Sequence, residues 1–103
     1  MNKLLLLLTT VPNKLLAEQI AKELIERKLS ACISIKEIIS IYKWQENIEQ
    51  NEEFEITIKS LPENLNRLIL ILKERSTYEV PECIYKIFDS ENSYFKWIEE
   101  SIS

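Results

Sequence analysis

Residues 31–44, ACISIKEIISIYKW, alternate apolar and polar side chains with one change of phase. In a strand the odd-numbered isoleucines of this stretch fall on one face and Ile38 falls on the other. The adjacent apolar pair Ile38 and Ile39 therefore predicts a β-bulge or a second buried face. Residues 54–60, FEITIKS, alternate as well. The polar loop between the two segments predicts an antiparallel hairpin.

This hairpin is long for the helix that precedes it. A strand over residues 32–45 extends roughly 45 Å, at about 3.3 Å per residue. The helix predicted over residues 13–28, with Leu16, Ile20 and Leu24 at helical spacing, covers only roughly 24 Å. The hairpin should therefore overhang the helical layer as an arm, and an uncovered two-stranded arm is only marginally stable in water. Because this arm is rich in isoleucine and aromatic residues, we expect another subunit to cover it.

The segments on either side of the hairpin complete the order of elements. Residues 3–10 form an apolar run that predicts a buried strand, because the run is too short for a signal peptide and no small-x-small cleavage site follows it. Asn13 is a plausible cap for the first helix. Ser60 and Glu63 resemble a capping box that would begin a second helix, with Pro62 in its first turn.

The second helix should end near Arg75, and residues 82–88 predict the last strand. Residues 91–103, ENSYFKWIEESIS, predict a short closing helix that packs Tyr94 and Trp97 into the core. The order β-α-β-β-α-β plus a C-terminal helix predicts an α+β, ferredoxin-like fold. We expect one domain over residues 1–103.

Composition excludes several classes of function. The chain has a formal net charge of −4, no histidine and no glycine. An acidic chain makes a poor nucleic-acid binder, and the absence of glycine excludes a glycine-rich phosphate loop. No segment approaches the roughly 20 apolar residues of a membrane span. Cys32 and Cys83 lack metal-site spacing, and we expect both to be reduced, unpaired thiols.

Several segments, in order and with matching spacing, resemble the CutA family of divalent-cation tolerance proteins. They are TTVPN (9–13), LSAC (29–32), SIYKW (40–44), IK (58–59) and YEVPE (78–82). The resemblance implies a cytoplasmic homotrimer, similar in shape to the PII signalling proteins, whose hairpins wrap onto neighbouring subunits. It also implies a link to tolerance of divalent metals, copper especially.

The chain departs from this family where the family's proposed copper site lies. Family members usually carry histidines directly before the Tyr-x-x-Pro-Glu segment, whereas this chain has Arg75, Ser76 and Thr77. Thr9 stands where the family's site uses a cysteine. Because copper affinity comes from imidazole and thiolate donors, we expect that this copper site is not retained. Cys32 and Glu82 are left as the candidate ligands for a divalent metal ion, and no other cofactor is predicted.

The family resemblance also implies where a ligand would bind. The matching positions near clefts between subunits are Tyr42, Trp44, Lys59, Tyr78 and Glu82. Such a set could orient a small ligand. It could equally form a Lys59–Glu82 ion pair and a packed aromatic interface, and both alternatives stay open. The pair Val80-Pro81 needs no functional explanation, because it suits the entry to a strand.

Two hypotheses for function follow. The leading one is a trimeric metal-response protein that binds a small ligand or metal ion at clefts between subunits and catalyses no reaction. The alternative is a trimeric scaffold without a ligand of its own. An enzyme such as an acylphosphatase is disfavoured, because the chain has no glycine-based anion cradle and no evident nucleophile–base pair.

Overall fold

The computed structural model describes residues 2–103 and contains a four-stranded antiparallel sheet with three α-helices. The strands are β1 (Lys3–Val11), β2 (Cys32–Trp44), β3 (Asn47–Ser60) and β4 (Ile84–Asp89). The helices are α1 (Lys14–Glu26), α2 (Leu65–Arg75) and α3 (Asn92–Ile102), and a 3-10 turn, η1 (Pro62–Asn64), precedes α2. The strand order β2-β3-β1-β4 is that of the predicted ferredoxin-like fold, which is confirmed.

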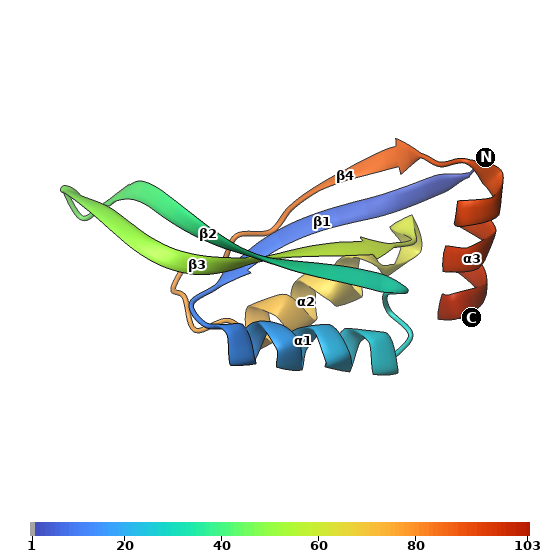
Figure 1. Ribbon diagram of the computed structural model, residues 1–103, viewed down its shortest axis with the longest axis horizontal. Helices are drawn as coiled ribbons and strands as arrows, with labels where there is room; N and C mark the ends of the chain where they lie inside the picture. The colour runs from blue at the N-terminus through green and yellow to red at the C-terminus, as the bar shows by residue number, and fades with distance from the viewer. Residues whose placement is uncertain (1) are drawn as a thin grey trace.

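Helices α1 and α2 cover one face of the sheet (Figure 1). The core between them holds Leu5 and Leu7 of β1, Ile56 and Ile58 of β3, and side chains from both helices such as Leu24. Alternate residues along each strand point to opposite faces, so the leucine run of β1 is divided between the core and the second face.

Helix α3 lies at the end of the sheet that is remote from the hairpin tip (Figure 1). It buries Ile98 against Leu4 and Leu61. The helix begins where the Glu91 carboxylate accepts hydrogen bonds from two backbone N–H groups. The prediction that Tyr94 and Trp97 fill the core is wrong, since these rings stack on each other and remain 37% and 48% exposed.

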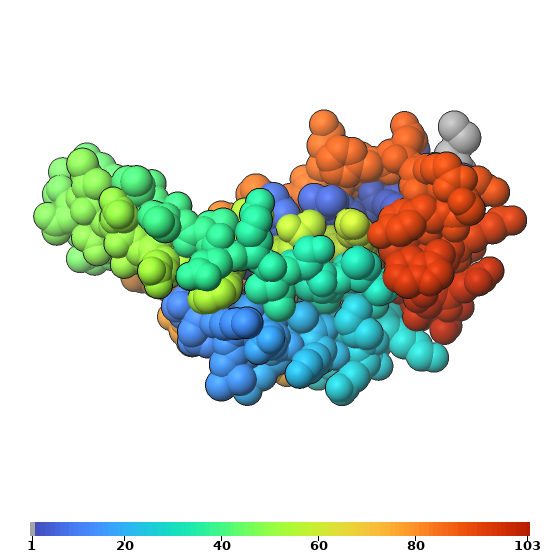
Figure 2. Space-filling model, viewed as in Figure 1, coloured from blue at the N-terminus to red at the C-terminus, as the bar shows by residue number. Residues whose placement is uncertain are grey.

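The predicted overhang is confirmed. The molecule measures 46 × 24 × 22 Å, and the β2–β3 hairpin extends beyond the helices as an arm (Figures 1 and 2). On the arm, Ile39 and Ile41 are 64% and 66% exposed and Ile48 is 81% exposed. Exposed isoleucines at this density are typical of a surface that another chain covers.

The hairpin itself corrects two predictions. Strand β3 begins at Asn47 rather than near residue 54, because Gln45 and Glu46, both with positive φ, turn the chain in two residues. The pairing from Cys32–Lys59 to Trp44–Asn47 runs without a break, so no bulge separates Ile38 from Ile39. The pair Ile38 and Ile39 predicted either a bulge or a second buried face, and only the second face remains.

The entries to α2 and β4 also differ from prediction. Ser60 is not a helix cap, because it ends β3 and its buried hydroxyl donates to the Leu29 carbonyl at 2.6 Å. The chain instead enters α2 through η1. Strand β4 begins at Ile84, two residues later than expected, and leaves Glu82 outside the ladder. The Asn13 cap is confirmed by its hydrogen bond from the Leu16 N–H at 2.8 Å.

Candidate functional site

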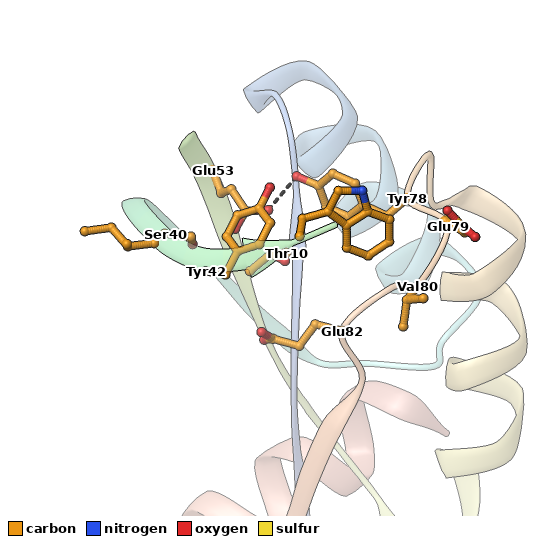
Figure 3. Close-up of a pocket in the computed structure, with 10 residues that line it drawn as sticks. Thr10, Ser40, Tyr42, Glu53, Tyr78, Glu79, Val80 and Glu82 are labelled. Carbon is orange, nitrogen blue, oxygen red and sulfur yellow. Dashed lines mark hydrogen bonds between the residues drawn. The ribbon is translucent and has the colours of Figure 1, made fainter. Parts of the chain in front are cut away.

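A pocket of about 620 Å³ lies where the arm leaves the body of the molecule. Strands β1, β2 and β3 form part of its wall, and the irregular segment between α2 and β4 forms the rest (Figure 3). Its volume lies within the usual range for small-molecule sites. The lining residues are Thr10, Ser40, Ile41, Tyr42, Trp44, Glu53, Tyr78, Glu79, Val80 and Glu82.

One hydrogen bond joins the two sides of this pocket. The Tyr78 hydroxyl donates to Glu53 Oε2 at 2.5 Å, as the dashed line in Figure 3 marks. Glu53 is only 9% exposed, so this bond compensates part of the cost of burying its carboxylate. Burial of the phenol, followed by its bond to Glu53, raises the pKa of Tyr78 strongly. Tyr78 therefore remains a donor across the physiological pH range.

Glu82 adds a second carboxylate, from the irregular segment that also carries Tyr78. Burial raises its pKa above the ordinary value, and the charges of Glu55 and Glu53 raise it further. The Glu79 carboxylate points away from those of Glu53 and Glu82 (Figure 3). Negative charge is thus concentrated around Glu53 and Glu82, in a partly buried setting where Coulomb interactions are weakly screened.

The structure brings together four of the five residues that the sequence singled out for a ligand cleft. Tyr42, Trp44, Tyr78 and Glu82 line this one pocket. Lys59 does not, because its ammonium group lies 3.3 Å from the Tyr94 hydroxyl and 5.5 Å from the centre of that ring. Within residues 2–103 the structure has no Lys59–Glu82 ion pair.

The weak metal candidates do not meet. Cys32 lies on the edge strand β2, whereas Glu82 precedes β4 at the other edge of the sheet. Thr9, at the family's cysteine position, is 3% exposed. Over the described part of the chain, no three His, Cys, Asp or Glu side chains converge to hold a metal ion. Both cysteines are free thiols, and burial raises the pKa of Cys83.

Sequence reasoning missed Glu53, because it assigned residues 45–53 to a polar loop. In the structure Glu53 pairs with Ile38 in the middle of the hairpin. A two-residue turn at 45–46 would have predicted this register, since antiparallel pairing is then determined by counting outward from the turn. The chain has no Asn-Gly or Asp-Gly signal at that turn.

Comparison with known proteins agrees with this architecture. Residues 5–101 match the family model described as CutA1 divalent ion tolerance protein. A CutA homolog from Xenopus laevis is 36% identical over 91 residues, which is 86% of this chain, and the chain spans only 60% of the length of that protein.

Solved structures are similar over nearly the whole chain. The CutA structure from Synechococcus elongatus superposes with a TM-score of 0.94 at 36% identity, over 100% of this chain and 93% of that one. A periplasmic divalent cation tolerance protein CutA from Archaeoglobus fulgidus gives a TM-score of 0.92 at 30% identity, over 97% and 99% of the two chains. The chain therefore belongs to the CutA1 family of divalent ion tolerance proteins.

Proposed function

We propose that this chain acts as a homotrimeric metal-response protein that binds a small ligand or metal ion at clefts between subunits and catalyses no reaction. The observation that supports this most is the pocket at the base of the arm, which a buried carboxylate, Glu53, lines together with Tyr42, Tyr78 and Glu82. A group of polar and charged side chains of this kind in a partly enclosed pocket is typical of a ligand site.

Self-association is supported by the apolar arm and by the second face of the sheet. Ile84 and Phe88 of β4 and Trp97 of α3 are 55%, 45% and 48% exposed. Together with the arm they leave more apolar surface uncovered than a small monomer usually tolerates. The trimeric state itself follows the family resemblance. The pocket lies beside the arm, so a neighbouring subunit that covered the arm would also close over the pocket.

The binding of a ligand is testable by thermal unfolding. A compound that binds only the folded protein raises its melting temperature by mass action. The purified protein is melted with Mg²⁺, Mn²⁺, Zn²⁺ and Cu²⁺ and with a panel of small anionic, neutral and cationic metabolites. A shift that disappears in both Glu82→Gln and Tyr42→Leu supports the proposal. If no compound shifts the melting temperature, the alternative of a scaffold without a ligand is favoured.

Copper deserves a separate titration, because the family is linked to it. The chain has no imidazole donor, so we expect calorimetry at neutral pH to give a Cu²⁺ dissociation constant no tighter than tens of micromolar, on the order expected for carboxylate donors alone. A nanomolar site lost in Cys32→Ser would instead assign metal binding to that thiol.

Localisation in the cytoplasm stays a prediction, since the Archaeoglobus fulgidus relative is named as periplasmic. Between residues 2 and 103, no helix combines the length and the apolar character needed to cross a membrane.

A further inference from the structure

The pocket at the base of the arm has an unbalanced negative charge. Its lining includes three glutamates, and no lysine or arginine of residues 2–103 is part of it. Lys36 stands across from Glu55 in the β2–β3 ladder, and Lys43 pairs with Glu46 near the tip of the arm at 3.6 Å. Neither lysine lines the pocket. A ligand for this pocket should therefore be positively charged.

One oxygen of the most buried carboxylate is left for that ligand. Glu53 Oε2 accepts from the Tyr78 hydroxyl, and Glu53 Oε1 accepts no hydrogen bond from the described residues. No fully buried side-chain oxygen of residues 2–103 lacks a partner, so Oε1 is at least partly accessible. A cation that approaches Oε1 would also meet the Glu82 carboxylate, whose charge Glu53 and Glu55 already oppose.

The other lining groups indicate which kind of cation the pocket would bind. A divalent ion prefers six or more oxygen ligands, whereas no three acidic or thiol side chains of the described chain converge on one point. Tyr42, Trp44 and Tyr78 supply three aromatic rings instead. Aromatic faces attract organic ammonium ions, which carry a diffuse charge and shed water more readily than a metal ion does.

We propose that this pocket binds a small organic ammonium ion, whose charged nitrogen lies between the carboxylates of Glu53 and Glu82 and against the rings of Tyr42 and Trp44. The inference rests on the proposed function of the pocket as a ligand site, and it names the chemical class of that ligand. Both quaternary ammonium ions and protonated amines share this chemistry. They differ in that only protonated amines donate hydrogen bonds to the carboxylates.

The test is calorimetric titration of the full-length protein in its native assembly. Choline and tetramethylammonium represent the quaternary ions, 1,4-diaminobutane represents the protonated amines, and 3,3-dimethyl-1-butanol is the uncharged isostere of choline. Phosphate buffer is used, because Tris is itself an organic ammonium ion. We expect saturable binding of one ligand per chain for at least one of the cations, and none for the alcohol.

Variants measure separately how much the aromatic ring of Tyr42 and the charge of Glu82 contribute to binding. Tyr42→Phe keeps the ring and removes only the hydroxyl that accepts a hydrogen bond from Asn51, so affinity should change by less than about twofold. Tyr42→Leu removes the ring and should weaken binding about tenfold, as should Glu82→Gln. Glu52→Gln is the matched charge control, since Glu52 is exposed on the same strand but on the opposite face from Glu53. Circular dichroism and sedimentation confirm that each variant folds and assembles as the parent does.

The outcomes distinguish this inference from the function on which it rests. Equal binding of choline and its uncharged isostere, or equal losses in Glu52→Gln and Glu82→Gln, would overturn the inference. So would the absence of binding by all three cations at millimolar concentration. If an anionic or neutral metabolite or a metal ion binds instead, and requires Glu82 and Tyr42, the pocket is still a ligand site and only its assignment to ammonium ions fails.

Discussion

The hydrogen bond between Tyr78 and Glu53 connects the irregular segment before β4 to the hairpin. We expect Tyr78→Phe to lower the free energy of unfolding by about 1.5–3 kcal/mol, because a bond to a charged group is lost and a buried oxygen loses its donor. Urea denaturation of Tyr78→Phe, Glu53→Gln and the double variant measures the coupling between the two side chains. Simple additivity of the two single effects would show that the bond contributes nothing to stability.

The raised pKa of Glu82 leads to a prediction about how the stability of the protein depends on pH. The folded state holds the Glu82 proton more tightly than the unfolded state does, so the protein loses stability as the pH rises above the ordinary carboxyl value, and this loss is complete above the folded pKa. Glu82→Gln removes that effect. We therefore expect the variant to melt at a higher temperature than the parent at pH 7, and the difference to shrink as the pH falls towards the ordinary carboxyl value of 4.5.

Melting curves from pH 3.5 to pH 8 provide the measurement. Glu99→Gln, on the exposed surface of α3, is the control and should leave the curve unchanged. A gain from Glu82→Gln that grows as the pH falls would mean that the sign of the Glu82 effect has been assigned wrongly.

Single residues of the site were predictable to different degrees. Tyr42, Trp44, Tyr78 and Glu82 were predicted through the family resemblance, because they stand in short motifs that keep their spacing. Lys59 belongs to the same resemblance, yet inside one chain it contacts Tyr94. The role of Glu53 depends on a tertiary register, and nothing in the residues next to it in the sequence indicates that role.

Helix α1 ends in a left-handed residue that is not glycine. Lys28 has a φ of 58°, its N–H bonds to the Ile25 carbonyl, and the following Leu29 N–H bonds to the Leu24 carbonyl. This is a Schellman motif, in which glycine is the favoured residue at the left-handed position. The contact of the Lys28 side chain with the Ser103 carbonyl is long, at 3.4 Å, and exposed.

We therefore expect Lys28→Gly to raise the free energy of unfolding by about 1 kcal/mol, because the side-chain strain of a left-handed backbone is removed. The same substitution at Lys22, an exposed position inside α1, should lower it by about 1 kcal/mol. Urea unfolding midpoints compare the two. Equal losses from both substitutions would contradict a strained backbone at Lys28.

At the scale of elements, the sequence pattern predicted every strand and α-helix and located the end of α2 at Arg75, but it misplaced the start of β3 and the entries to α2 and β4. The turn at Gln45 and Glu46 uses two residues with positive φ, which usually calls for asparagine or glycine. Ser60 matched a capping pattern, yet its hydroxyl is held by the Leu29 carbonyl. In both cases tertiary contacts of the sheet decide the local conformation, and local propensity does not.

At the scale of the whole molecule, the prediction concerns the oligomeric state. We expect a homotrimer with no stable folded monomer at micromolar concentration, because the arm exposes Ile39, Ile41 and Ile48. Ile41→Asp should dissociate or unfold the assembly, since burying an unpaired charge costs several kcal/mol. Leu15→Asp is the control, because Leu15 on α1 is 65% exposed against 66% for Ile41. Analytical ultracentrifugation of both variants is the measurement, and a compact, well-folded 12.2 kDa species of the parent protein would contradict assembly.

Strand β2 pairs with β3 along its whole length and stands at one edge of the sheet. Its other side therefore offers a row of backbone donors and acceptors, flanked by isoleucines, to any extended peptide. Such an edge is a template for cross-β aggregation unless it is covered, bent or charged. The regular register that makes the arm long also leaves it without a bulge to twist this edge away. The charged residues Lys36, Glu37 and Lys43 of β2 oppose such stacking. We therefore expect the correct assembly of newly synthesised chains to compete kinetically with amyloid-like stacking at this edge.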